Sequence, residues 1–165
     1  MSKWGINFAI SLSALAVGCV REDSILVEDG IPFSKNIGSL SLQFDGADSI
    51  VVRNKEKYLR IHARVPATIR LSPRRTRLVL NFGSGSGQVL ELESYDLHSM
   101  QQTSMSKFEE MVVKATQKAR CDIKNDEISY VAKEWRNENS LRIVTENWSR
   151  RSACPALDRD WVVEI

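Results

Sequence analysis

The chain has few of the residue types on which metal binding and acid–base catalysis usually depend. Its 165 residues include two histidines, His62 and His98, and three cysteines. The cysteines form no CxxC pair, and the histidines do not have the close spacing of a zinc site. We therefore expect no metal site and no cofactor.

Neither sign of charge dominates, and no apolar run is long. Lys and Arg number 23 against 21 Asp and Glu, a formal charge of +2, so nothing draws the whole chain to nucleic acid. The basic segments also lack the interleaved aromatic residues of single-strand binding sites. The most apolar segment, residues 4–17, is interrupted by Asn7 and two serines and falls short of the ~20 residues of a transmembrane helix.

A glycine-rich segment, residues 83–87, lacks the residues of a catalytic loop. No Gly-Lys-Ser/Thr follows it, as a phosphate-binding P-loop requires. Gly85 stands where a nucleophilic serine would stand between Gly83 and Gly87. The segment therefore predicts a flexible hairpin turn between two strands.

The N-terminus has the features of an export signal. Lys3 precedes a short apolar stretch that ends in the small residues Ala16, Val17 and Gly18, directly before Cys19. This arrangement resembles the lipobox of bacterial lipoprotein precursors. The resemblance implies cleavage before Cys19, diacylglyceryl transfer to its thiol and, because Val20 rather than Asp follows, anchoring in the outer membrane.

Two other interpretations of the N-terminus stay open. Ala14-Leu15-Ala16 is itself a signal-cleavage sequence, which would leave Cys19 unmodified in a freely periplasmic protein. In the other interpretation, the apolar stretch is the first strand of a cytosolic protein. On the lipoprotein interpretation, residues 1–18 are the signal peptide, 19–38 are the lipidated N-terminus and a tether, and 39–165 form a single domain.

Lipidation of Cys19 would leave an even pair of cysteines, Cys121 and Cys154, in a compartment where disulfides persist. We expect these two cysteines to be bridged. Two buried free thiols are the alternative.

Alternation with a period of two predicts strands through much of the chain. The clearest case is 58–65, where Leu59, Ile61, Ala63 and Val65 share one face. Further strands are expected around 40–44, 78–82, 90–93, 128–135, 141–148 and 161–165.

Helical spacing of apolar residues appears only over 105–120, where Ser106 and Glu109 are spaced as a capping box. The sequence therefore predicts an α+β fold. We expect a mainly antiparallel sheet, sandwich-like or curved, with one amphipathic helix packed on it.

Two features could form a partner-binding surface. Nine basic residues against one acid lie between Arg53 and Arg77. They could bind an acidic partner, or they could pair with acidic flanking strands. Three tryptophans near the C-terminus could line a surface or close a core. The residues selected as candidates for partner binding are Arg60, Arg64, Arg74, Arg75, Arg77, Trp135 and Trp148.

Candidates for catalysis are few: the two histidines and the pair Glu91 and Glu93, which would share a strand face at a spacing of about 7 Å. No catalytic residue is predicted from them. The expected function is a non-enzymatic protein-binding module on the periplasmic face of the outer membrane. The alternatives are an immunity lipoprotein that neutralises a delivered toxin and, third, a small envelope hydrolase.

Overall fold

The computed structural model describes residues 24–83, 90–121, 128–147 and 154–165. Antiparallel strands make up most of this part of the chain, with one α-helix among its elements. The elements are β1 (Ser24–Val27), β2 (Phe33–Ile37), β3 (Leu40–Phe44), β4 (Ser49–Asn54), β5 (Lys57–His62), β6 (Ala67–Leu71), β7 (Arg77–Gly83), β8 (Leu90–Asp96), β9 (Gln101–Thr103), α1 (Ser106–Ala119), β10 (Ile128–Trp135), β11 (Ser140–Asn147) and β12 (Arg159–Glu164).

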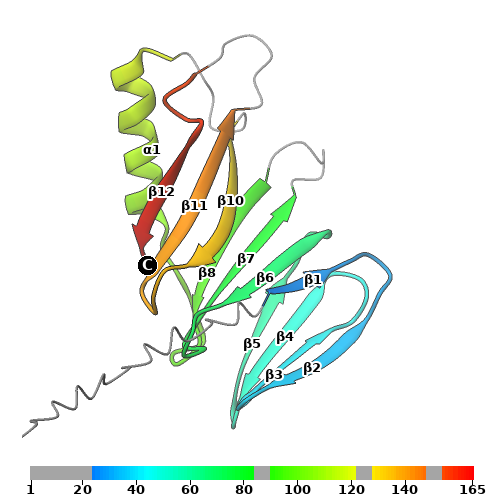
Figure 1. The fold of residues 1–165 in the computed structure, drawn as a ribbon. Coiled ribbons are helices and arrows are strands. Elements are labelled where there is room, and N and C mark those ends of the chain that lie inside the picture. The colour runs from blue at the N-terminus through cyan, green and yellow to red at the C-terminus, as the bar shows by residue number, and fades with distance from the viewer. Residues whose placement is uncertain (1–23, 84–89, 122–127, 148–153) are drawn as a thin grey trace, which may run out of the picture.

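The strands form three sheets (Figure 1). A central sheet has the order β1-β6-β7-β8-β9, a second sheet is the meander β2-β3-β4-β5, and a third is β10-β11-β12. This arrangement confirms the predicted α+β, sandwich-like fold. In the described part of the chain, no helix has the length and apolar character needed to cross a membrane.

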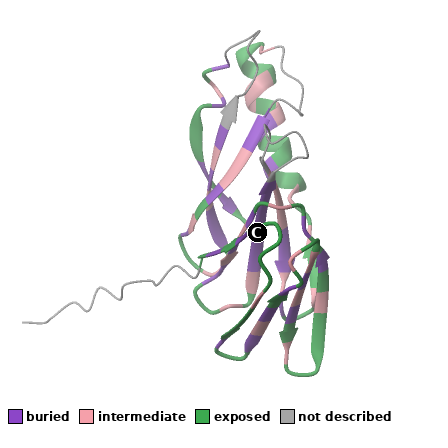
Figure 2. Cartoon of the chain, turned by 90° about the vertical axis from the view of Figure 1, so that its right-hand side faces the viewer, coloured by how far each residue is buried: buried purple, intermediate pink, exposed green. Residues whose placement is uncertain are grey.

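The first hydrophobic core lies between the β2–β5 sheet and one face of the central sheet. Strand alternation directs the side chains inward, as predicted for Leu78, Leu80 and Phe82, which are at most 1% exposed. Figure 2 shows buried segments along the strands, and β7 is buried on both faces from Leu78 to Phe82. Burial of the apolar faces of both sheets joins them into a sandwich.

The second core lies on the opposite face of β7, around Val79. Helix α1 contributes Phe108 and Val112, and the ring of Phe108 packs edge-on against Trp161 at a centroid distance of 5.9 Å. Residues of β7 therefore belong to two cores, one on each face.

A buried asparagine joins the third sheet to the central one. The Oδ1 atom of Asn81 on β7 accepts the backbone N–H of Ala132 at 2.9 Å, and its Nδ2 donates to the carbonyl of Tyr130 at 2.9 Å. Arg70 Nε also donates to the carbonyl of Ala132. Since β10 is an edge strand, these side chains satisfy backbone groups that a neighbouring strand would otherwise bind.

The predicted helix is confirmed, but its capping box does not form. Ser106 is already the first helical residue, so its hydroxyl is not at the N-cap, which is Met105. The N–H of Ser106 instead donates to Ser104 Oγ at 3.1 Å. At the other end, Arg120 adopts the left-handed conformation and ends the helix.

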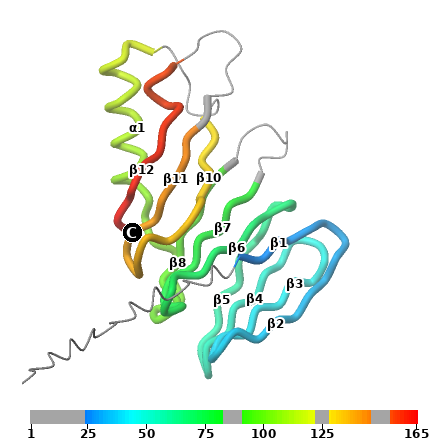
Figure 3. The backbone as a smooth tube through the Cα atoms, in the orientation of Figure 1, coloured from blue at the N-terminus to red at the C-terminus, as the bar shows by residue number. Residues whose placement is uncertain are grey.

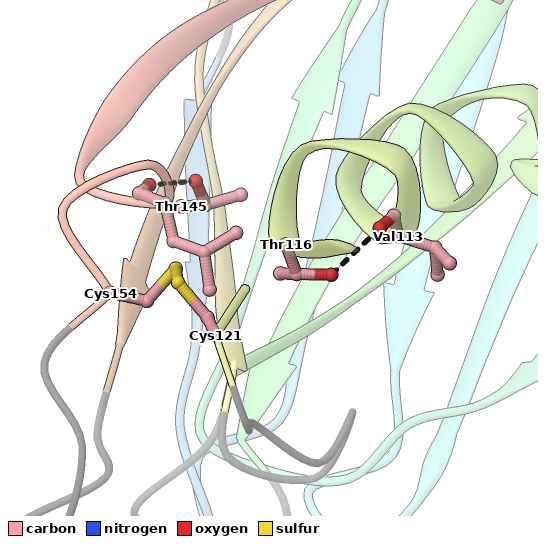
Figure 4. Close-up of a disulfide and its surroundings, with 6 residues drawn as sticks. Val113, Thr116, Cys121, Thr145 and Cys154 are labelled. Atoms are coloured by element: carbon pink, nitrogen blue, oxygen red, sulfur yellow. Dashed lines mark hydrogen bonds between the residues drawn. A yellow bond between two sulfur atoms is a disulfide. The ribbon is translucent and has the colours of Figure 1, made fainter. Parts of the chain in front are cut away.

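The predicted disulfide is confirmed. It joins Cys121, just after α1, to Cys154, which precedes β12, across a sequence separation of 33 residues (Figure 4). Cys154 is 1% exposed and belongs to the second core. The bridge therefore fastens the C-terminal end of α1 to the sheet that it covers.

The predicted tether, residues 19–38, is wrong over most of its length. Ser24–Val27 form β1, which pairs with β6, and Phe33–Ile37 form β2. The side chains of Ile25 and Val27 are in the first core, so burial favours a strand there although the run is only four residues long. The described residues begin at Ser24, five positions after Cys19, which itself lies outside them.

The alternation predicted for 58–65 is correct, but the strand ends sooner. Hydrogen-bonded pairing stops at His62, and the N–H of Ala63 donates to the carbonyl of Asp48 at 2.7 Å. The chain then crosses to the central sheet through Pro66, which has no N–H to donate to a ladder.

Candidate binding surfaces

The basic residues predicted as one patch are divided among several places. Arg60 lies on β5, in the four-stranded sheet. Arg64 pairs with Glu91 and lies over the ring of Phe82 at 4.1 Å. The remaining three, Arg74, Arg75 and Arg77, lie in or beside the turn between β6 and β7. The structure therefore does not bring these arginines together on one face.

The outward face of the β2–β5 sheet is a mostly polar surface. Cross-strand pairing defines its members, because paired residues share a face. One row runs across all four strands through Ser34, Gln43, Val51 and Arg60. The next row runs through Asn36, Ser41, Arg53 and Tyr58. We call these eight residues the outer face; each is exposed or half-buried.

A shallow open groove of about 520 Å³ crosses the first row of the outer face. Its floor includes Gln43, Val51 and Arg60, and the loops beyond the strands contribute Pro32 and Asp45. The groove offers hydrogen-bonding side chains around a small apolar centre. Such a lining is suited to a polypeptide or another polar ligand that lies across the strands.

The charged groups of the outer face are cationic. Its eight residues include Arg53 and Arg60 and no acid. Tyr58 is 63% exposed, and the guanidinium of Arg53 lies over its ring at 5.9 Å from the centroid. Exposed tyrosine and arginine are the residue types that most often dominate binding energy at protein interfaces.

Glu138 holds the β6–β7 turn against the β10–β11 turn. Its carboxylate accepts hydrogen bonds from the hydroxyls of Ser72 and Thr76. It also accepts the backbone N–H groups of Arg74, at 2.7 Å, and Thr76, at 3.3 Å. Beside it, Arg77 Nε donates to Asn139 Oδ1. The arginine-bearing turn is thus fixed by a carboxylate 62 to 66 residues away in the sequence.

This contact makes stability depend on pH. Partial burial raises the pKa of Glu138, but the hydrogen bonds from Ser72, Thr76 and the backbone N–H groups outweigh burial and hold the pKa below its ordinary value. A lowered pKa stabilises the fold above the unfolded-state pKa, near 4.3, and this contribution disappears as pH falls through the folded-state value. We expect Glu138→Gln to lose about 1–2 kcal/mol at pH 7, and the difference from wild type to shrink on acidification. Urea unfolding of wild type and Glu138→Gln at pH 7, and again below the folded-state pKa of Glu138, measures this difference in the free energy of unfolding. A difference that stays constant between the two pH values would contradict the role of the charge.

Trp135 and Trp161 are buried and do not line a surface. Trp135 is 6% and Trp161 3% exposed, and both pack in the second core. Trp161 Nε1 donates to Thr145 Oγ1 at 2.8 Å. Burial of these large rings stabilises the packing of the third sheet on α1, which removes Trp135 from the candidate binding residues. Trp148 lies outside the described residues.

The candidates for catalysis either form other contacts or lie exposed on the surface. Glu91 pairs with Arg64, and Glu93 accepts the hydroxyl hydrogen of Tyr95. His62 Nδ1 lies 3.2 Å from Asp48 Oδ2, but their side chains are 75% and 60% exposed.

His98 is exposed on the β8–β9 turn, where its backbone N–H donates to Asp96. Within the part of the chain that the structure describes, no cluster of three His, Cys, Asp or Glu side chains could hold a metal ion.

The outer face was not predicted as one surface, in part because two of its eight residues, Ser34 and Asn36, lie in the segment interpreted as tether. The sequence does contain an indication of this strand: the polar Ser34 and Asn36 alternate with the apolar Phe33 and Ile37, which point toward the first core. Lys35 interrupts the apolar positions of this strand and conceals the alternation.

A scan against protein-family models finds no match, and searches of curated proteins and of solved structures find no similar protein.

Proposed function

We propose that this protein is a lipoprotein on the periplasmic face of the outer membrane, held by an acylated Cys19, and that it acts there as a non-enzymatic protein-binding module. The outer face is its binding surface. The partner is a protein that places acidic side chains opposite Arg53 and Arg60.

The observation that carries the proposal is the outer face itself: eight exposed or half-buried residues in two rows, with two cations, no acid and an exposed tyrosine. Two further observations support the compartment. The sequence before Cys19 resembles a lipobox, and the bridge between Cys121 and Cys154 is a bond typical of oxidising compartments.

Site-specific photocrosslinking in intact bacteria tests the binding surface. A photoreactive residue replaces Gln43 in the groove of the outer face, and in a second strain it replaces Lys118, which is exposed on α1. We expect a discrete adduct from position 43 only. Its yield should fall about tenfold or more in Arg53→Glu/Arg60→Glu, because interfacial arginines are common binding hot spots.

The controls are the protein level and the mass of the mature N-terminus. Charge reversal should leave both unchanged, and a triacylated Cys19 in the outer-membrane fraction is expected. Equal adducts from positions 43 and 118, or an adduct that survives charge reversal, would contradict binding through the outer face. The identity of the adduct separates an envelope partner from a delivered toxin.

A further inference from the structure

Five turns gather at one end of the molecule, where β1 also begins; we call it the turn end. The N–H of Leu97, after β8, donates to the carbonyl of Thr76 at 2.8 Å, and Lys57 Nζ donates to the carbonyl of His98 at 2.9 Å. Gly38, between β2 and β3, lies against the guanidinium of Arg75. The contacts of Glu138 add the β10–β11 turn. The turn end comprises residues 38–39, 55–57, 72–77, 96–100 and 136–139.

The chain enters the fold at this end. Ser24 pairs with Arg70 in an antiparallel ladder, so β1 begins beside the end of β6, where β6 runs into the turn at 72–76 (Figure 3). Four residues separate Cys19 from Ser24, and the five steps from one Cα to the next span at most about 18 Å when the chain is fully extended. An acyl anchor on Cys19 therefore holds the turn end close to the bilayer.

Charge is distributed unequally between the two ends of the sandwich. The turn end carries six cations: Lys55, Lys57, Arg74, Arg75, Arg77 and Arg136. Its own acids are Glu56, Asp96 and Glu138. Two further acids lie beside it: Glu164 shares a surface pocket with Arg74, and Glu134 pairs with Arg136 at 3.2 Å. The carboxylates of Asp96 and Glu138 accept hydrogen bonds from backbone N–H groups.

The opposite end is acidic. There the N–H of Gly30 donates to the carbonyl of Gly46, which brings together the loop at 28–32 and the turn at 45–49. These ten residues include four acids and no Lys or Arg. An anionic surface therefore attracts the turn end and repels the end opposite to it.

We propose that the turn end binds the anionic phospholipid headgroups of the membrane in which Cys19 is anchored, an inference that rests on the proposed function. Each cation near an anionic bilayer contributes roughly fivefold to binding. The groove of the outer face lies toward the acidic end, since it is lined by Pro32 and Asp45. Headgroup binding thus directs the groove away from the membrane.

Vesicle co-sedimentation tests this binding apart from the acyl anchor. The full mature chain carrying Cys19→Ser is mixed with vesicles of phosphatidylethanolamine and phosphatidylglycerol, or of phosphatidylcholine alone. We expect binding to the anionic vesicles only, weakened by salt. Lys55→Gln/Arg74→Gln should reduce it about thirtyfold, while the matched variant Lys114→Gln/Lys118→Gln on α1 should not.

Equal binding to both kinds of vesicle, or equal loss in both double variants, would overturn the inference. This result is independent of lipidation, which the mass of the mature N-terminus reports. An unacylated Cys19 with selective anionic binding would refute the anchor but keep the headgroup site. An acylated Cys19 without selective binding would leave the proposed function standing and refute the headgroup site.

Discussion

Breaking the bridge between Cys121 and Cys154 should lower the free energy of unfolding by about 3–4 kcal/mol. The bridge closes a loop of 33 residues, and the chain-entropy model assigns that stabilisation to a loop of this length. Because a small domain has only 5–15 kcal/mol in total, the loss is a large share of its stability. Urea denaturation of Cys121→Ala/Cys154→Ala against the oxidised wild type measures it.

The single variants provide the matched control. Either Cys121→Ala or Cys154→Ala alone removes the bridge, so each should lose nearly as much as the double variant. Wild type in reducing agent lacks the bridge but keeps both cysteine side chains, so its free energy of unfolding should approach that of the variants. Any remaining difference reports the packing of Cys154, which is buried. A wild-type midpoint that reductant does not change would show that the bridge does not stabilise the fold.

Asn81→Ala should cost about 3 kcal/mol. The Asn81 side chain, 7% exposed, supplies partners for the N–H of Ala132 and the carbonyl of Tyr130. Loss of this side chain leaves both backbone groups without a hydrogen-bond partner, which costs about 1–3 kcal/mol of stability for each buried group. Urea unfolding measures the loss, and amide exchange at Ala132 should quicken because β10 opens more readily.

Asn81→Asp tests the same contact with almost no change in volume. A carboxylate still accepts the N–H of Ala132, but it places an oxygen against the carbonyls of Glu91 and Tyr130, to which Asn81 Nδ2 donates. This repulsion raises the pKa of the new carboxyl in the folded state, so Asn81→Asp should regain stability relative to wild type as pH falls. The exposed Asn36→Ala is the control and should change stability by less than about 0.5 kcal/mol. Equal losses at positions 36 and 81 would contradict the role of the buried amide.

Strands with regular alternation and a buried face were predictable from sequence, as Leu78, Leu80 and Phe82 illustrate. The helix and the bridge between Cys121 and Cys154 were predictable as well. β1 was not, because four residues carry too little periodic signal. What fixes β1 is pairing with β6, about 40 residues away, which the local sequence does not encode.

The candidate surfaces were harder to predict, because neighbours in the sequence separate when strands reverse. Arg60 and Arg64 are four residues apart, yet one belongs to the outer face and the other pairs with Glu91 of the central sheet. Conversely, Gln43 on β3 and Arg60 on β5 line one groove, although two turns of the chain separate them in the sequence. Whether a tryptophan is buried, as Trp135 is, depends on packing between distant elements.

The two faces of β7 also set an order in which the chain can fold. The buried members of the first core all lie between Ile25 and Leu97, whereas the second core combines Val79 with residues from 108 onward. Because a nascent chain emerges from its N-terminus, the sandwich can close before α1 and the third sheet are available. The later half then packs on a surface that already exists. Both bridged cysteines lie in that later half, so oxidation secures only the last part of the molecule to assemble.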